Sequence, residues 1–418
     1  MKTYNRFKTA ATLLPLMLFA GSSFASEIKT LTLQDCCQKV RQRLASVLEQ
    51  AEHVNQADEQ IRQARAPFLP DVHFRSSKTY EDSVNNTVAG EFTETKLSAA
   101  QSLFRGFKDK NLLDIAKDDL LVQQLLLKSA MRNASGDAVQ AFYAAALPEV
   151  GITNDAENIS MVQDRITELD SRVRLGKSRE TELFSVQSTL ASVKADLAKS
   201  NGDRTAALAE LGLLIGEDAI AIDVAAEAPD TMAVPSLSDA LTAVQNRSDL
   251  AAARKALDEQ ELRVAFDKGA FLPELNVVGN YYFDRPPGAP SLWDAALSLD
   301  FPLFQGGRDR AQIRIDESQL KAEQIALDFQ LRQAEADVRT AQAALAASIE
   351  QYSFLKEAND NADAAYRSLV KEYRLGLVNN LDVLAGLSTL LTAKSAYTRS
   401  AVQVRQNRAL LMVTLEQL

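Results

Sequence analysis

Few residues in this chain are of the types that carry out chemistry. Its only histidines, His53 and His73, are too few and too far apart in the sequence to suggest a metal site. The two cysteines, Cys36 and Cys37, are adjacent in an amphipathic helical stretch, where we expect two small apolar residues rather than a strained disulfide. The sequence also has no nucleophile motif and no glycine-rich phosphate loop. We therefore expect no enzyme, no metal site and no cofactor.

The charge pattern argues against a nucleic-acid-binding surface on this protein. The formal net charge is −10, and the basic and acidic residues are interspersed rather than clustered. A surface that binds nucleic acid, or a polybasic surface that binds membranes, would show clusters of Lys and Arg. We therefore predict no nucleic-acid partner.

Residues 1–25 have the composition of a secretory signal peptide. A basic start is followed by the apolar segment 10–20 and by small residues up to Ala25. Cleavage there would leave Ser26 first, and without a cysteine at the cut the lipid anchor of a bacterial lipoprotein is not expected. Beyond this segment no apolar run reaches the roughly 20 residues that a transmembrane helix needs. Any part that enters a membrane would have to be a β-barrel.

The longest predicted element is a helix from Arg308 to Leu375, a stretch with neither glycine nor proline. At about 1.5 Å per residue it would be roughly 100 Å long, more than a globular core needs. Apolar residues recur along it as in a coiled-coil seam, at Leu327, Leu331, Ala334, Val338, Ala341, Leu345, Ile349, Tyr352 and Leu355. Small residues mark a second face at Ala336, Ala343, Ala344, Ala346 and Ala347. The helix is therefore either a stave with neighbours on two sides or half of a two-helix rod with good helix formers facing solvent.

The sequence repeats itself at an offset of 200 residues. Seven of the 21 positions from Arg174 to Lys194 are identical to their counterparts at this offset. We interpret residues 26–215 and 236–418 as two structural repeats. Residues 216–235, rich in Ala, Asp and Pro, would form a connector, an equatorial segment packed outside the rod.

Each repeat should contain a helix, two strands, a long helix, a turn and a last helix. The strands are expected at about 71–80, 92–104, 275–283 and 292–301, and the helices before them at 31–66 and 237–268. The first repeat's long helix, 107–175, is interrupted in the sequence at Gly136, Pro148 and Gly151. Pro148 corresponds to Ser348, so the two long helices should differ there, by a bend or by a break.

Four strands per chain are too few to close a membrane barrel, and an open sheet would leave its edges unpaired. A trimer would supply twelve strands under cyclic symmetry and would gather the long helices into a second tube. The last strand suits a lipid-facing wall, because one face carries Trp293, Ala295, Leu297, Leu299 and Phe301. The first hairpin alternates weakly, so a small soluble sheet that caps a coiled coil is an alternative.

Together these features resemble one family, the TolC-like outer membrane factors, which are the exit ducts of bacterial drug efflux pumps and type I secretion systems. The resemblance covers nearly all of the mature chain. Besides the duplicated order, it rests on Phe68-Leu69-Pro70, Phe271-Leu272-Pro273, Pro302-Leu303-Phe304-Gln305-Gly306-Gly307, Tyr373-Arg374-Leu375-Gly376 and Leu381-Asp382-Val383-Leu384. It implies a homotrimer with a twelve-stranded outer membrane β-barrel on a periplasmic α-helical barrel, without catalysis or cofactor.

The resemblance also implies partners and site residues. An inner membrane transporter of the ABC or RND type supplies the energy, and a periplasmic adaptor (membrane fusion protein) docks on the helix-turn-helix tips. The tips correspond here to Leu175, Gly176, Lys177, Leu375, Gly376 and Leu377. Glycine is also the usual residue at a helix C-cap, and both roles can hold together.

Some family members constrict the tunnel with acidic residues just past the second tip. This chain has Asp382 there, but Ala385 stands where some family members have a second aspartate. Three copies of Asp382 facing the bore would form a cation-attracting ring. The commoner explanation of such a residue is an exposed acid at a helix N-terminus.

The sequence therefore predicts a channel-tunnel in the outer membrane, in contact with its lipid and with a large periplasmic part, that passes substrate passively. The alternative is a soluble periplasmic coiled-coil adaptor or scaffold without a pore. An adaptor should also contain a compact β-rich lipoyl-like module between its helical arms, and no segment has that pattern. The cargo is not specified, because the bore of a passive duct need not recognise it.

Overall fold

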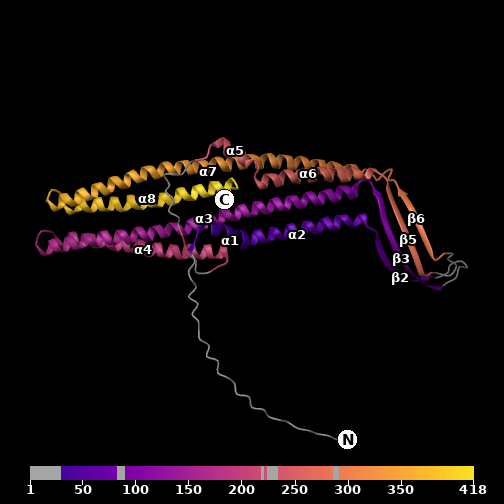
Figure 1. Cartoon of the computed structure of the whole chain (residues 1–418), viewed down its shortest axis with the longest axis horizontal. Helices are drawn as coiled ribbons and strands as arrows, with labels where there is room; N and C mark the ends of the chain where they lie inside the picture. The colour runs from indigo at the N-terminus through magenta and orange to yellow at the C-terminus, as the bar shows by residue number, and fades with distance from the viewer. Residues whose placement is uncertain (1–29, 82–89, 218–220, 224–233, 286–290) are drawn as a thin grey trace, which may run out of the picture.

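The computed structural model describes residues 30–81, 90–217, 221–223, 234–285 and 291–418. The described chain is elongated, with two helical hairpins at one end and a sheet at the other (Figure 1). The predicted signal peptide, residues 1–25, lies outside the described residues, as do residues 218–220 and 224–233 of the predicted connector.

Both halves of the chain have the same order of elements (Figure 1). The first half consists of β1 (Thr30–Leu31), α1 (Leu33–Arg43), α2 (Ala45–Arg65), η1 (Ala66–Phe68), β2 (Asp71–Glu81), β3 (Gly90–Arg105), α3 (Lys108–Arg174) and α4 (Glu180–Ile215). The second half consists of β4 (Ala221–Ile222), α5 (Leu237–Val244), α6 (Ser248–Lys268), η3 (Gly269–Phe271), β5 (Glu274–Asp284), β6 (Trp293–Asp300), α7 (Arg308–Arg374) and α8 (Asn380–Thr414). The prediction of a mostly helical chain with a small β part is confirmed.

Two helices that the sequence predicts as continuous are each divided. The helix expected over 31–66 breaks at Leu44, whose ψ of 130° is extended. The helix expected over 237–268 breaks before α6, where Arg247 has a ψ of 139°. Neither break contains glycine or proline, and each lets a short helix bury its own apolar residue, Val40 or Val244, against a long helix. Tertiary packing overrides helix propensity here.

The first long helix, α3, continues unbroken through Gly136, Pro148 and Gly151. Of the two alternatives at Pro148, the break is therefore excluded. The proline leaves the carbonyl oxygen of Ala144 without its helical partner. Ala144 is exposed, so water can bind that oxygen, while the neighbouring Ala145 and Ala146 are fully buried and hold the helix in place.

The predicted seam of α7 is confirmed, since each of its nine positions is buried or half-buried. Its most buried members, Ala334, Val338 and Leu345, belong to an apolar cluster with Val404 and Leu411 of α8. The alanines of the second face are exposed in the single chain. None of the residues that the structure describes covers that face.

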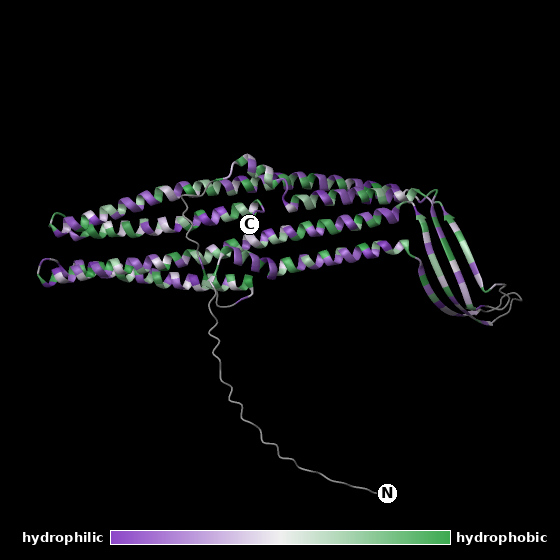
Figure 2. Cartoon of the chain, in the orientation of Figure 1, coloured by the Kyte–Doolittle hydropathy of each residue, from purple (hydrophilic) through white to green (hydrophobic). Residues whose placement is uncertain are grey.

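The core consists of apolar clusters spaced along the rod rather than a single centre, and Figure 2 shows hydrophobic and hydrophilic residues alternating along the helices. In the first half, Phe142 of α3 and Leu211 of α4 pack with Val40 of α1. In the second half, Leu345 and Leu411 pack α7 on α8. Burial of each such side chain stabilises the fold by about 1.5–3 kcal/mol.

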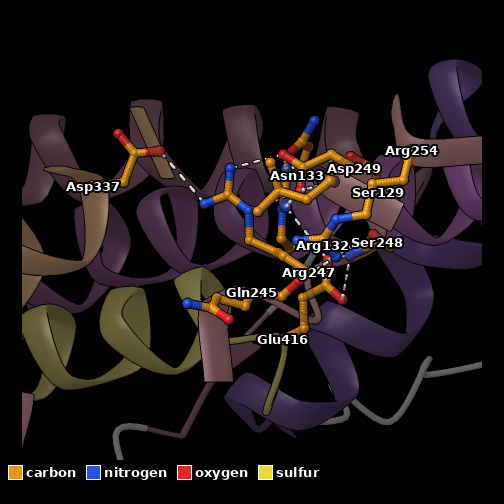
Figure 3. Close-up of polar contacts among 11 residues, drawn as sticks. Ser129, Arg132, Asn133, Gln245, Arg247, Ser248, Asp249, Arg254, Asp337 and Glu416 are labelled. Atoms are coloured by element: carbon orange, nitrogen blue, oxygen red, sulfur yellow. Dashed lines mark hydrogen bonds and ion pairs between the residues drawn. The ribbon is translucent and has the colours of Figure 1, made fainter. Parts of the chain in front are cut away.

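Charged side chains connect the two halves near the middle of the rod (Figure 3). Arg132 of α3 forms ion pairs with Asp249 of α6 (3.1 Å) and with Glu416, which follows α8 (3.3 Å). Glu416 also accepts a hydrogen bond from the Ser248 hydroxyl (2.6 Å). Burial acts to raise the pKa of Asp249, but the hydrogen bonds and ion pairs from Arg247 and Arg132 outweigh it and hold that pKa well below its usual range.

Strands β2, β3, β5 and β6 form an antiparallel sheet in that order, so the hairpins of both halves lie side by side, while β1 and β4 pair in parallel as a separate two-stranded sheet. The ends of β2, β3, β5 and β6 differ from the predicted strand ends by at most two residues. Within the described residues, β2 and β6 each have one unpaired edge. The apolar and polar residues of the first hairpin do alternate, although weakly. Val72 and Phe74 of β2 lie on one face of the sheet together with Ala99 and Leu97 of β3.

No helix in the described parts of the chain combines the length and the apolar character needed to cross a membrane.

Candidate functional site

The two helical hairpins end in matching turns. Gly176 has a φ of 68° and Gly376 a φ of 77°, the left-handed conformation that glycine adopts without a Cβ clash. In the first turn, the N–H of Gly176 donates to the carbonyl of Val173 and the N–H of Lys177 to that of Arg172, both at 2.9 Å. This is a Schellman motif, so the C-cap interpretation of the glycines is confirmed.

The second turn repeats this hydrogen-bond pattern. Gly376 N–H donates to the carbonyl of Tyr373 at 3.0 Å, and Leu377 N–H donates to that of Glu372 at 2.9 Å. Both turns direct side chains into solvent, because Leu175, Lys177, Leu375 and Leu377 are all exposed. The structure therefore places all six predicted tip residues at the free end of the rod (Figure 1).

An apolar cluster packs the two hairpins together behind the tips. It contains Val162 and Leu169 of α3, Val186 of α4, and Val383 and Leu387 of α8, all without exposed surface. The tips thus form one unit rather than two free ends.

Tyr373, at the end of α7, joins the second hairpin to the first through polar contacts. Its hydroxyl donates to Glu182 Oε2 at 3.2 Å and lies 3.2 Å from the Ser178 hydroxyl. The guanidinium carbons of Arg165 and Arg172 lie 4.4 Å and 4.5 Å from the centre of its ring, within cation–π distance. We call this set of five residues the tip clasp.

Ion pairs and hydrogen bonds beside the clasp also join the two hairpins. Arg165, only 2 % exposed, donates to Glu168 Oε2 at 2.9 Å and to Asn380 Oδ1 of α8 at 2.6 Å. Glu168 also accepts from Arg374 Nε of α7 at 2.8 Å. Burial acts to raise the pKa of Glu168, but the hydrogen bonds and charges of Arg374 and Arg165 outweigh it and lower that pKa. The Glu168–Arg374 ion pair therefore links α3 to α7, and the Arg165–Asn380 hydrogen bond links it to α8.

The clasp was not predicted from the sequence. Tyr373 lies in the Tyr-Arg-Leu-Gly motif that marks the second tip, but its partner Glu182 is 191 residues away. Nothing in a single sequence indicates which acid of the first tip that hydroxyl reaches.

Asp382 is exposed and forms a capping box at the start of α8. Its N–H donates to Asn379 Oδ1 at 3.0 Å, and its carboxylate accepts from the Asn379 N–H at 3.1 Å. This helix-terminal role accounts for the aspartate within one chain. The cation-attracting ring stays a prediction.

The other reactive residues lie away from the tips. Cys36 and Cys37 are free thiols on the buried face of α1, where burial raises their pKa values to about 12 and about 11. Both thiols are therefore protonated and unreactive at neutral pH. Among the described residues, no group of histidine, cysteine or acidic side chains could hold a metal ion.

A cavity of about 1290 Å³ lies at the elbow where the helices meet the sheet. Many of its lining groups are amides and hydroxyls, including Gln60, Gln63, Gln101, Asn276 and Ser298. Two of them bond to the chain itself, since Gln101 donates to the Pro67 carbonyl at 2.9 Å and Ser298 to the Asn276 carbonyl at 3.5 Å. The lining also contains apolar residues such as Leu69, Leu112 and Ile115, so it mixes polar and apolar groups, and it contains no catalytic arrangement.

Known proteins share both the sequence pattern and the fold. A model of the outer membrane efflux protein family matches residues 36–217 and 241–415. The outer membrane efflux protein BepC of Brucella suis biovar 1 (strain 1330) is 21 % identical over 408 residues, which cover 96 % of this chain and 87 % of BepC.

Two solved structures have the same fold. A crystal structure of CusC superposes with a TM-score of 0.82 at 17 % identity and covers 98 % of both chains. That of VceC from Vibrio cholerae superposes with a TM-score of 0.79 at 17 % identity, covering 92 % of this chain and 95 % of VceC. The resemblance to TolC-like outer membrane factors is confirmed, and the chain belongs to the outer membrane efflux protein family.

Proposed function

We propose that three copies of this chain form a channel-tunnel that exports substrate across the outer membrane without catalysing a reaction. The family consists of outer membrane efflux proteins rather than enzymes, and this chain is an outer membrane protein with a large periplasmic helical part. The observation that carries the proposal is the sheet at one end of the rod, which has two faces of opposite character and two unpaired edges.

One face of the sheet is apolar and exposed over β5, β6 and the part of the first hairpin nearest the helices, although a soluble protein would cover it. Toward the loop of that hairpin the same face carries Ser76, Lys78 and Thr95. Its large side chains are Val72, Phe74, Leu97, Tyr281, Trp293, Leu297 and Leu299. The opposite face is polar and carries His73, Arg75, Ser98, Ser102, Asn276, Asn280, Asp294 and Ser298. Apolar outside and polar inside is the pattern of a strand wall between lipid and water.

The unpaired edges suggest how the wall closes. The free edge of β2 in one copy can pair with the free edge of β6 in the next, and a heterologous contact of this kind closes into a ring. Three copies would then supply the twelve strands that the sequence analysis expects. The exposed alanine face of α7 would lie against a neighbouring helix in the same assembly, which favours the stave over the solvated rod.

The free end of the rod would face the rest of an export machine. We assign adaptor docking to Leu175, Gly176, Lys177, Leu375, Gly376 and Leu377, with an inner membrane transporter of the ABC or RND type as the source of energy. The tip clasp would hold the two hairpins together at rest, and its polar contacts would have to separate for the hairpins to move apart. Asp382 would attract cations if its three copies faced the bore.

The test is reconstitution and export. We expect the purified chain to run as a trimer by native mass spectrometry in detergent and to conduct ions in planar bilayers. In a strain that lacks the channel, co-expression with candidate adaptor–transporter pairs should restore export with one of them. A monomer without pore activity, under conditions that preserve other barrels, would overturn the proposal.

A variant at the edge of the sheet distinguishes assembly from folding. Ala295→Pro would remove an N–H from the free edge of β6, at the proposed contact between copies, because the N–H groups that pair with β5 belong to residues 292, 294, 296 and 298. We expect loss of the trimer with the helical content retained. The matched Ser76→Pro change in β2 tests the opposite edge in the same way, because the Ser76 N–H points away from β3.

A further inference from the structure

The duplication makes the two tips equivalent by position, yet they present different chemistry to solvent. Where the first tip has Lys177, Arg179 and Thr181, the second has Leu377, Asn379 and Leu381. At the second tip Leu375, Leu377 and Leu381 are 75 %, 71 % and 74 % exposed. The first tip keeps only Leu175 of this set, 69 % exposed.

The fold does not need these three leucines. The apolar cluster behind the second tip is formed by other residues, including Tyr373, Val378 and Val383. The turn itself is held by Gly376 and its backbone hydrogen bonds. Exposed apolar side chains gathered within one turn of the rod end therefore mark an interaction surface.

The charges beside the leucines indicate what covers them. Lys177 and Arg179 are exposed, and their side chains have no ion pair or hydrogen bond within the described residues. They flank Ser178, whose hydroxyl lies 3.2 Å from that of Tyr373 at the end of α7, so the charged tip adjoins the apolar one. A partner that covers the leucines must offer carboxylates to these cations, or it would desolvate them unpaired at a cost in affinity.

We propose that the second tip is the apolar anchor of the docked adaptor and that the first tip is a charged rim that orients it. The adaptor surface would then present apolar side chains to Leu375, Leu377 and Leu381, and aspartate or glutamate to Lys177 and Arg179. This inference rests on the docking role proposed above. Apolar anchors at the centre of an interface carry most of its affinity, whereas rim charges mainly affect association and its dependence on salt.

The experiment uses the intact trimer in detergent and the adaptor that restores export in the assay above. Binding is measured at low and at high salt. The double variant Leu377→Ala/Leu381→Ala should weaken binding at least about tenfold at both salt concentrations. The matched variant Lys177→Ala/Arg179→Ala should weaken it about threefold at low salt and leave it unchanged at high salt. Both variants should keep the trimer and its conductance, because all four side chains are exposed.

Each other outcome excludes a part of the proposal. Equal, salt-independent losses from the two variants would overturn the division of roles and leave docking at the tips intact. No loss from either variant would overturn docking itself. Association of wild-type trimers with one another, abolished by the leucine changes, would show that a second copy rather than an adaptor covers the apolar tip.

Discussion

The two halves of the chain place the same turn in different surroundings. Gly106 and Gly306 both connect a strand to a long helix, with φ of 62° and 66°. A Cβ at Gly106 would overlap the carbonyl oxygen of Gly269, whereas a Cβ at Gly306 would meet nothing within 4 Å. The duplication therefore preserved the local conformation, while packing between the halves makes one turn sensitive to substitution and leaves the other tolerant.

The helices before the sheet differ in the same way. Ala64 of α2 and Ala116 of α3 are buried together in the first half. In the second half, the residue at the same distance before the Phe-Leu-Pro turn as Ala64 is Asp267 of α6. The residue at the same distance after the strand-to-helix turn as Ala116 is Asp316 of α7. The first half thus joins its helices through methyl groups, and the second half joins them through two carboxyls.

The largest effect should come from the turn glycines. Gly106→Ala combines a left-handed residue, which costs about 1–2 kcal/mol, with an overlap of backbone atoms that only a shift of the chain can relieve. Gly306→Ala carries the first cost alone. We expect Gly106→Ala to lower the thermal unfolding midpoint, measured by circular dichroism, far more than Gly306→Ala does. Equal shifts would mean that the two turns do not differ in packing.

The tip glycines should separate assembly from export. Valine at Gly376 would take a positive φ at a cost of roughly 1–2 kcal/mol, which is small beside the buried wall of an assembled trimer. We expect Gly376→Val to leave the detergent-resistant trimer near the wild-type level while export falls sharply. Gly176→Val is the matched change in the first half. Equal loss of trimer and export would show that the glycine acts only in folding.

The tip clasp allows a smaller and more local test, because the first half has Val173 where the second has Tyr373. Tyr373→Phe removes the hydroxyl bonded to Glu182 and Ser178, and should destabilise the clasp by about 1 kcal/mol. Tyr366→Phe is the control, since no hydrogen bond of its hydroxyl is found in the described residues. We expect Tyr373→Phe alone to increase the open probability in single-channel recordings. Unchanged recordings would contradict a closing role for the clasp.

The carboxyl pair should give the smallest effect, visible as a pH dependence. Burial and the neighbouring Asp316 raise the pKa of Asp267 to about 6. Because this pKa is higher in the folded chain than in the unfolded one, the protonated group stabilises the fold at low pH, and this stabilisation is lost as the pH rises through about 6.

Asp267→Asn should therefore raise the unfolding midpoint at pH 7 and flatten its change between pH 5 and pH 7. The exposed Asp328→Asn in α7 is the control and should leave the profile unchanged. A profile identical to that of the wild type would show that the pair does not share a proton.

Much of the fold could be predicted from the sequence because the signals are local and periodic. The seam of α7 follows from the spacing of residues such as Val338 and Leu345, and the tips follow from Gly176 and Gly376. The divisions at Leu44 and Arg247 had no such signal, since burial of Val40 and Val244 against distant helices decides them. At Pro148 the sequence left a bend or a break open, and burial of the neighbouring Ala145 and Ala146 keeps α3 continuous.

The sequence by itself determined the duplicated order of elements, the long helices and the glycines that end them, since each depends on neighbours within a few residues. Only the tertiary structure decided which distant residues meet: Tyr373 with Glu182 and Gly106 with Gly269 across the halves, and Asp267 with Asp316 within the second half. In the first two of these pairs more than 160 residues separate the partners. Their contact depends on how whole hairpins pack, and no local propensity encodes that.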